Sequence, residues 1–307
     1  MKVTEHVANA KDPLISFEIT PPKRGLNLND ALQTVGILKQ YNPAFIDVTY
    51  HPIQLEYRRD PSSGGIEEVI TRKYPGTRTI CSHIQLELDA VPHILCRGFS
   101  RHETSELLAE TKFDLVRNIL VVQGDNNGYN EPHHPAVQTY NHPSEIIPQI
   151  KKEFGDDFCI GVAGYPEKHF ESPNLRTDMD FFQRKVESGA DYAITQMLFN
   201  NSFYFKYLDR CKKRGINIPI IPGVKVITSE RQLVSIPSEF HVEIPYELSK
   251  KISAASKEDR IEIGIDWTTK QVQKLISQGV PITHFYIFGD PTPTLRVLDN
   301  LSFGKKD

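Results

Sequence analysis

Eight short apolar runs, separated by segments with helical periodicity, constrain the fold of this 307-residue chain. No hairpin signal joins consecutive runs, so we expect strands that pair in parallel through helical crossovers. Eight parallel strands in one continuous core predict an α/β fold, the closed (β/α)8 TIM barrel, with residues 1–307 as a single domain. The runs lie at residues 14–20, 44–50, 90–95, 118–122, 158–163, 192–197, 218–223 and 284–288.

A doubly wound open sheet is the main rival fold, and it usually carries a glycine-rich turn after its first strand. The corresponding turn here is Thr20-Pro21-Pro22, and no G-x-G-x-x-G occurs in the chain. We expect residues 56–76 to form a polar arm with a loop tip at 61–65. We also expect an extra helix over residues 253–270, which Trp267 packs against the barrel.

Composition excludes several classes of partner. The chain has 36 basic and 39 acidic residues and a net charge of −3, which provides no field for nucleic acid or an anionic membrane. We therefore expect a small-molecule ligand. The four cysteines are widely spaced, as in reduced thiols of a cytoplasmic protein. Residues 1–13 lack an apolar signal core and no run is long enough to span a bilayer, so a soluble protein is expected.

Glu18 is the most informative single residue. It lies within the first apolar run, between Phe17 and Ile19, and two prolines end that run directly afterwards. Burial disfavours a charged carboxylate and raises its pKa, which would make Glu18 a usable proton donor. The alternative is a glutamate on an edge strand that faces water.

Polar residues end nearly every apolar run. Since the carboxyl ends of barrel strands meet at one mouth, these residues predict a site for a large ligand with many polar groups. Asp125 could instead turn a strand into a loop, and Gln196 could anchor one. The histidines show no metal-ligand spacing, and we expect no metal. The strand-end residues are Glu18, Thr49, Tyr50, His93, Gln123, Asp125, Tyr165, Glu167, Gln196, Lys225 and Asp290.

Seven motifs, in order from about residue 14 to about residue 288, resemble those of methylenetetrahydrofolate reductases. The motifs are Phe17-Glu18-x-x-Pro21-Pro22, Val48-Thr49-Tyr50, Pro92-His93, Gly124-Asp125, Tyr165-Pro166-Glu167-x-His169, Arg184-Lys185-x-x-x-Gly189-Ala190 and Ile194-Thr195-Gln196. Each motif is weak alone, but their order makes the resemblance specific.

The resemblance implies a (β/α)8 flavoprotein of one-carbon metabolism and methionine biosynthesis. Such oxidoreductases bind FAD, reduce it with NAD(P)H, and convert 5,10-methylenetetrahydrofolate to 5-methyltetrahydrofolate. By resemblance, Glu18 is the general acid, Asp125 lies beside the flavin and the pterin, and Gln196 contacts the folate ring. We also expect a homo-oligomer.

The resemblance also implies a set of FAD contacts. We expect Arg184 and Lys185 near the start of a helix, where their charges would face the diphosphate; the alternative is a solvated helix face that includes Glu187. The implied contacts are Thr49, Tyr50, His93, Gly124, Asp125, Tyr165, His169, Asp178, Arg184 and Lys185.

Four positions depart from the family pattern. Gln123 and Asp290 stand where arginines are usual, Phe181 replaces an asparagine, and Glu230 replaces an aromatic residue. Two other functions therefore stay open. One is a related barrel flavoenzyme with another one-carbon or amine substrate, or with a protein electron donor. The other is a folate- or flavin-binding subunit with little catalysis, against which the retained Glu18 argues.

Overall fold

The computed structural model describes residues 1–23, 25–51, 54–71, 73–124 and 138–303. Eight parallel strands close a barrel in the order β1-β10-β9-β8-β7-β6-β5-β2. Each strand coincides with one of the eight apolar runs, so the predicted TIM barrel is confirmed. The strands are β1 (Leu14–Ile19), β2 (Ile46–Val48), β5 (Ala90–Leu95), β6 (Asn118–Val122), β7 (Cys159–Gly164), β8 (Tyr192–Met197), β9 (Ile220–Val224) and β10 (Ile282–Ile287).

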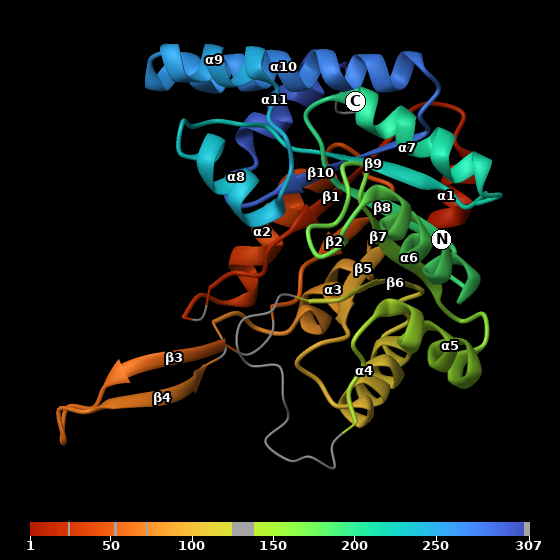
Figure 1. Ribbon diagram of the computed structural model, residues 1–307, viewed down its shortest axis with the longest axis vertical. Coiled ribbons are helices and arrows are strands. Elements are labelled where there is room, and N and C mark those ends of the chain that lie inside the picture. Colours follow the sequence, from red (N-terminus) through yellow and green to blue (C-terminus); the bar gives the residue numbers. More distant parts are fainter. Residues whose placement is uncertain (24, 52–53, 72, 125–137, 304–307) are drawn as a thin grey trace.

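Helices cover the outside of the barrel (Figure 1). Several begin at a capping side chain, as at Asn27 and Ser100, which accept backbone N–H groups of the first turn. The helices that follow the barrel strands are α2 (Leu28–Lys39), α3 (Thr77–Ile84), α4 (Arg101–Phe113), α5 (Pro143–Phe154), α6 (Leu175–Glu187), α7 (Asn201–Lys213), α10 (Lys257–Ser277) and α11 (Thr292–Asn300). The others are α1 (Val3–Asn9), α8 (Gln232–Phe240) and α9 (Tyr246–Ala254).

The barrel interior is apolar at one end. Phe45, Val91, Tyr192 and Ile221 fill it below the site, and Val3 of α1 packs against them. A second, larger cluster lies between the strands and the surrounding helices. Because the lower interior is filled, a ligand can enter only from the carboxyl ends of the strands.

An antiparallel hairpin, β3 (Gln54–Arg59) and β4 (Ile66–Thr71), interrupts the crossover from β2 to α3. It projects away from the barrel (Figure 1). The polar arm and its loop tip are confirmed, and the eight barrel strands pair in parallel as expected. The sequence did not predict that the arm itself forms a hairpin. Much of the hairpin is exposed, so its sequence lacks the alternation of apolar and polar residues that marks a half-buried strand.

The extra helix is α10, which is longer than the sequence predicts. Trp267 donates its indole N–H to the carbonyl oxygen of Phe199 at 3.1 Å, which confirms its packing role. Gly264 permits the close approach, since a Cβ there would lie 1.8 Å from the carbonyl oxygen of Ile227. Within the described ranges, each helix is too short or too polar to cross a membrane.

Candidate active site

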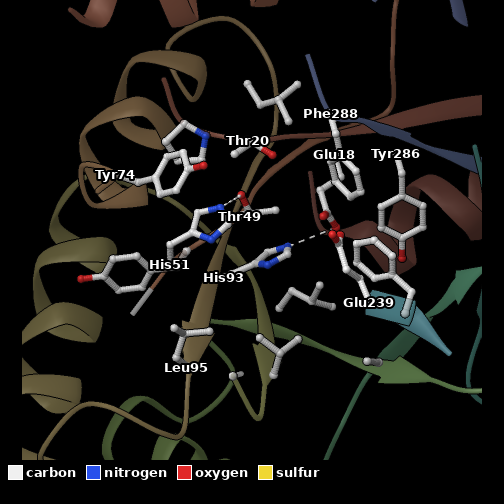
Figure 2. Close-up of a pocket in the computed structure, with 18 of the residues that line it drawn as sticks. Glu18, Thr20, Thr49, His51, Tyr74, His93, Leu95, Glu239, Tyr286 and Phe288 are labelled. Atoms are coloured by element: carbon white, nitrogen blue, oxygen red, sulfur yellow. Dashed lines mark hydrogen bonds and ion pairs between the residues drawn. The ribbon is translucent and has the colours of Figure 1, made fainter. Parts of the chain in front are cut away.

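A cavity of about 1220 Å³ opens at the carboxyl ends of the barrel strands. Figure 2 shows part of its wall, with Glu18 and His93 on one side and Thr49, His51 and Tyr74 on another. The cavity wall brings together seven of the predicted strand-end residues: Glu18, Thr49, Tyr50, His93, Gln123, Tyr165 and Gln196. Gly124, which follows Gln123, also lines it.

Glu18 lies in the wall of this cavity with only 6% of its surface exposed, so the water-facing alternative is wrong. Its Oε2 lies 3.5 Å from Nε2 of His93 on β5. Burial raises the pKa of the Glu18 carboxyl, and the opposing influences of His93 and Lys225 do not cancel that effect. The side chain is therefore poised to hold a proton at the cavity surface.

Two residues that the sequence reasoning did not select lie behind Glu18. Asp47 is the register partner of Glu18 on β2, and His284 on β10 places its Nε2 3.8 Å from Oε2 of Glu18. His284 is held by Ser16, whose Oγ lies 2.9 Å from Nδ1 of the ring. The available signal was that Asp47 and His284 are polar residues within apolar runs. That they lie close together depends on strand register, which the sequence does not reveal.

Glu18, Asp47 and His284 place ligand atoms within 4.8 Å of one another, a spacing that could hold a metal ion. Either a cation or protons could neutralise such a cluster. Burial raises the pKa of both carboxyl groups. Protons on the carboxyl groups would therefore neutralise the cluster without a cation.

Lys225 follows β9 and is buried in the same region, with 7% of its surface exposed. Its Nζ lies 4.3 Å from the centre of the Phe288 ring, a cation–π contact. Burial lowers the pKa of this amine to about 8, although Glu18 opposes the change. A positive charge near Glu18 in turn favours the carboxylate form of Glu18.

Aromatic and backbone groups form the part of the wall for which FAD contacts are implied. Tyr50 stacks on Phe99 with ring centres 5.1 Å apart, and Tyr165 meets the edge of His169 at 4.6 Å. Gly124 has a φ of 85°, a conformation that favours glycine, and it presents bare backbone to the cavity.

Three implied FAD contacts do not line the cavity. Asp178 accepts hydrogen bonds from the backbone N–H of His169 and the hydroxyl of Ser172, so it fixes the loop that carries His169. Lys185 donates to the carbonyl oxygen of Ala163 at 3.0 Å, and burial lowers its pKa to about 8. Arg184 is exposed, with its guanidinium 4.9 Å from the centre of the Phe181 ring.

The expected position of Arg184 and Lys185 near a helix start is wrong, because both lie in the last turn of α6. Asn174 caps this helix, and its side chain accepts the backbone N–H of Thr177. The cap places the start of the helix at Leu175, more than two turns before Arg184.

Other cationic groups of the cavity wall escaped the sequence reasoning. Arg97 lines the cavity, and its Nη1 lies 3.5 Å from Glu171. Lys168 also lines it and donates to the carbonyl oxygen of Ser172 at 2.6 Å. Both lie in loops, where no periodic pattern identifies the direction of a side chain.

The end of α8 closes one side of the mouth. His241 stacks on Phe170 with ring centres 4.4 Å apart, and Phe240 stacks on Phe288 at 5.8 Å. Glu167 accepts the backbone N–H of Glu243 at 2.7 Å, and burial raises its pKa to about 7. Glu167 thus ties the segment after α8 to the loop after β7.

The positions that depart from the family pattern have local partners. Gln123 lines the cavity and donates to Glu171 at 3.2 Å. Glu230 pairs with Arg260 at 2.7 Å, and Asp290 accepts hydrogen bonds from Thr292 at the start of α11. Asp125, expected beside the flavin, lies outside the described residues.

Comparison with known proteins identifies relatives along nearly the whole chain. A family model described as methylenetetrahydrofolate reductase matches residues 2–302. The 5,10-methylenetetrahydrofolate reductase of Buchnera aphidicola subsp. Baizongia pistaciae is 32% identical over 92% of this chain and 90% of its own length. Methylenetetrahydrofolate reductase 2 of Saccharomyces cerevisiae is 26% identical over 98% of this chain. The chain spans about half the length of that yeast relative, 50%.

A solved structure supports the fold. It is an uncharacterized protein from Clostridium thermocellum, described as binding two copies of 5-methyl-5,6,7,8-tetrahydrofolic acid. Its TM-score is 0.61 and its identity is 14%, over 96% of each chain, so this likeness shows the fold alone. The family model and the bacterial relative, each matched over most of the chain, show that the protein belongs to the methylenetetrahydrofolate reductase family.

Proposed function

We propose that the protein reduces 5,10-methylenetetrahydrofolate to 5-methyltetrahydrofolate, with FAD as its cofactor and NAD(P)H as the hydride source. One observation carries the proposal: in a chain of this family, Glu18 holds a buried carboxyl with a raised pKa in the wall of the barrel-mouth cavity. The description of the Clostridium thermocellum protein, which shares the fold, is consistent with a reduced folate as ligand.

The reaction gives Glu18 a specific task. The methylene bridge between two nitrogens must open before a hydride can reach its carbon, and opening requires a proton on the departing nitrogen. A carboxyl that retains its proton near neutral pH can supply it, whereas an ordinary exposed glutamate is already ionised. In this proposal, Glu18 transfers its proton to that nitrogen and becomes a carboxylate beside His93 and Lys225.

The residues of the cavity fit FAD. The cavity volume of about 1220 Å³ exceeds the roughly 300–1,000 Å³ typical of a site for one small ligand, so the cavity has room for two ligands. Gly124 permits close approach to the backbone, while Arg97 and Lys168 provide positive charge for a diphosphate. When bound, FAD supplies the redox chemistry by accepting a hydride from the nicotinamide and passing it to the folate.

Other chain residues would orient the ligands. Thr49, Tyr50, Tyr165 and His169 line the cavity and would contact the flavin. Gln196 accepts the backbone N–H of Met197 through Oε1 at 2.9 Å, which fixes its amide at the cavity wall for contact with the folate ring. We keep Asp125 in the proposal as the carboxylate that favours a cationic intermediate of the folate.

The test uses the purified chain, incubated with FAD and freed of excess cofactor by gel filtration. We expect a flavin spectrum, bleaching under anaerobic conditions by NADH or NADPH, and return of the colour on addition of 5,10-methylenetetrahydrofolate. Mass spectrometry should then identify 5-methyltetrahydrofolate.

The same experiment separates the other functions. Flavin that is reduced by a nicotinamide but not reoxidised by methylenetetrahydrofolate would contradict the proposal and favour another substrate. Bound flavin that neither nicotinamide reduces would favour a protein electron donor or a binding subunit. FMN in place of FAD serves as the control for recognition of the dinucleotide.

A further inference from the structure

Four ionisable side chains from four different strands meet inside the barrel at the base of the cavity, where Glu18 and His93 form part of its wall. They are Glu18 of β1, Asp47 of β2, His93 of β5 and His284 of β10. Nε2 of His93 lies 3.5 Å from Oε2 of Glu18 and 3.9 Å from Oδ2 of Asp47. One imidazole nitrogen thus faces both carboxyl groups.

Asp47 is the unexplained member of this cluster. Its exposed surface is 0%, and it does not line the cavity, so a ligand there would not touch it. Neither of its carboxyl oxygens has a hydrogen-bond partner among the described residues, and the same holds for Nε2 of His93 and of His284. Buried polar atoms without partners are costly unless a proton or a water joins them.

The charges around Asp47 indicate where protons reside. Burial raises the pKa of Asp47 well above its ordinary value; His284 opposes this effect and Glu18 adds to it. Burial also lowers the pKa of His93, and that of His284 to about 4, so both rings are neutral near neutral pH. These shifts favour protons on the two carboxyl groups over protons on the two rings.

The remaining titratable groups around the cluster leave this assignment intact. Tyr192 on β8 and Tyr286 on β10 have raised pKa values, as does Cys81 on α3, so all three stay neutral. Lys225 is the one further cation that acts on Glu18 within the described part of the chain, and it favours ionisation of Glu18 before that of Asp47. A proton left on Asp47 is therefore available when Glu18 has lost its own.

We propose that Asp47 and Glu18 share a proton through His93, so that Asp47 is a positioning residue that resupplies the acid of the active site. After Glu18 gives its proton to the substrate nitrogen, Nε2 of His93 accepts the Asp47 proton and passes it to the Glu18 carboxylate. Asp47 is left ionised until a solvent proton returns. The use of this proton in catalysis rests on the proposed function, whereas the sharing itself does not.

Infrared spectroscopy of the flavin-free protein tests the sharing directly. The carbonyl stretch of a protonated carboxyl is followed from about pH 5 to about pH 9, spanning the usual range of perturbed carboxyl groups. In the wild type we expect two coupled steps, one of which extends above neutral pH. In Asp47→Asn only the Glu18 signal of the pair remains. It should disappear at a pH at least about one unit lower than the pH at which the last wild-type signal disappears, which corresponds to a tenfold change in proton affinity.

Controls keep the result interpretable. Asp290→Asn removes an exposed carboxyl at the start of α11 and should leave both steps unchanged. Asp47→Ser provides a second neutral variant if the asparagine does not fold. The inference would be overturned if the Glu18 and Asp47 signals titrated independently. It would also be overturned if the protein held one equivalent of a divalent metal and the carboxyl signals appeared only after a chelator had removed it.

A kinetic measurement then separates this inference from the proposed function. The rate of flavin reoxidation by methylenetetrahydrofolate is measured as a function of pH. In Asp47→Asn, the loss of this rate at alkaline pH should occur at a lower pH than in the wild type, whereas the rate of flavin reduction by nicotinamide should be unchanged. An unchanged pH dependence of reoxidation would refute the supply role of Asp47. Coupled infrared steps in a protein that does not act on the folate would refute the proposed function and leave proton sharing standing.

Discussion

Replacing Lys225 by methionine should stabilise the protein below about pH 8. The folded environment lowers the pKa of this amine from 10.5 to about 8, chiefly through burial. At 1.36 kcal/mol for each pKa unit, keeping Lys225 protonated in the folded state costs about 3 kcal/mol. The methionine variant keeps an apolar side chain of similar length and avoids that cost.

The sign of the pH dependence follows from proton binding. Between about pH 8 and 10.5 the unfolded chain binds the Lys225 proton while the folded protein has released it. The unfolded state therefore binds more protons, and the contribution of Lys225 to stability rises with pH across this window. The advantage of Lys225→Met should be largest below about pH 8 and should fade towards 10.5.

Urea unfolding of the wild type and of Lys225→Met at several pH values measures this difference. Titrating groups that do not interact with Lys225 cancel when the two proteins are compared at the same pH; Glu18, whose carboxylate form Lys225 favours, does not. Lys270→Met is the matched control, because Lys270 is exposed and pairs with Asp266. A stability difference that stays constant from about pH 7 to 10.5 would refute a buried, charged Lys225.

Two further substitutions test the packing of the barrel and the cavity wall. Gly223→Ala should destabilise the protein by about 1–3 kcal/mol in calorimetry, because the new Cβ would lie 2.4 Å from the Tyr286 ring. The control Gly36→Ala, whose Cβ meets open space on α2, should be neutral or stabilising, and equal effects of the two substitutions would contradict the packing argument. Arg97→Ala should weaken FAD binding about tenfold to a hundredfold, through loss of a charge-assisted contact of about 1.5–3 kcal/mol. We expect a smaller loss for Arg184→Ala, because Arg184 lies outside the cavity lining, and flavin titration showing the reverse order would assign the diphosphate to α6.

The barrel could be predicted from sequence because its strands are buried on both sides. Such strands read as continuous apolar runs, and eight of them leave few alternative folds. The burial of Glu18 followed from the same pattern, since its neighbours Phe17 and Ile19 belong to the core. The β3–β4 hairpin has no such burial, so its strands left no comparable signal.

The polar cluster at the base of the cavity could not be predicted in the same way. Asp47 and His284 are far apart in the chain, and they meet because β1 pairs with β2 on one side and β10 on the other. Strand register is a property of the closed barrel. Arg97 and Lys168 escaped prediction because loop geometry directs their side chains. The start of α6 was misplaced although Asn174 offered a capping signal.

The central claim is that Glu18 donates the proton that opens the methylene bridge. Glu18→Gln preserves the size of the side chain but removes the proton at neutral pH. Stopped-flow absorbance can follow the two half-reactions of the FAD-loaded variant separately. Reduction of the flavin by a nicotinamide is a hydride transfer that does not need this proton, so its rate should be retained.

Reoxidation by 5,10-methylenetetrahydrofolate should slow by about a hundredfold to ten-thousandfold, the usual cost of losing a general acid, or roughly 3–5 kcal/mol of barrier. Equal slowing of both half-reactions would assign Glu18 to flavin binding or to the shape of the pocket. Unchanged rates in both would contradict the acid role outright.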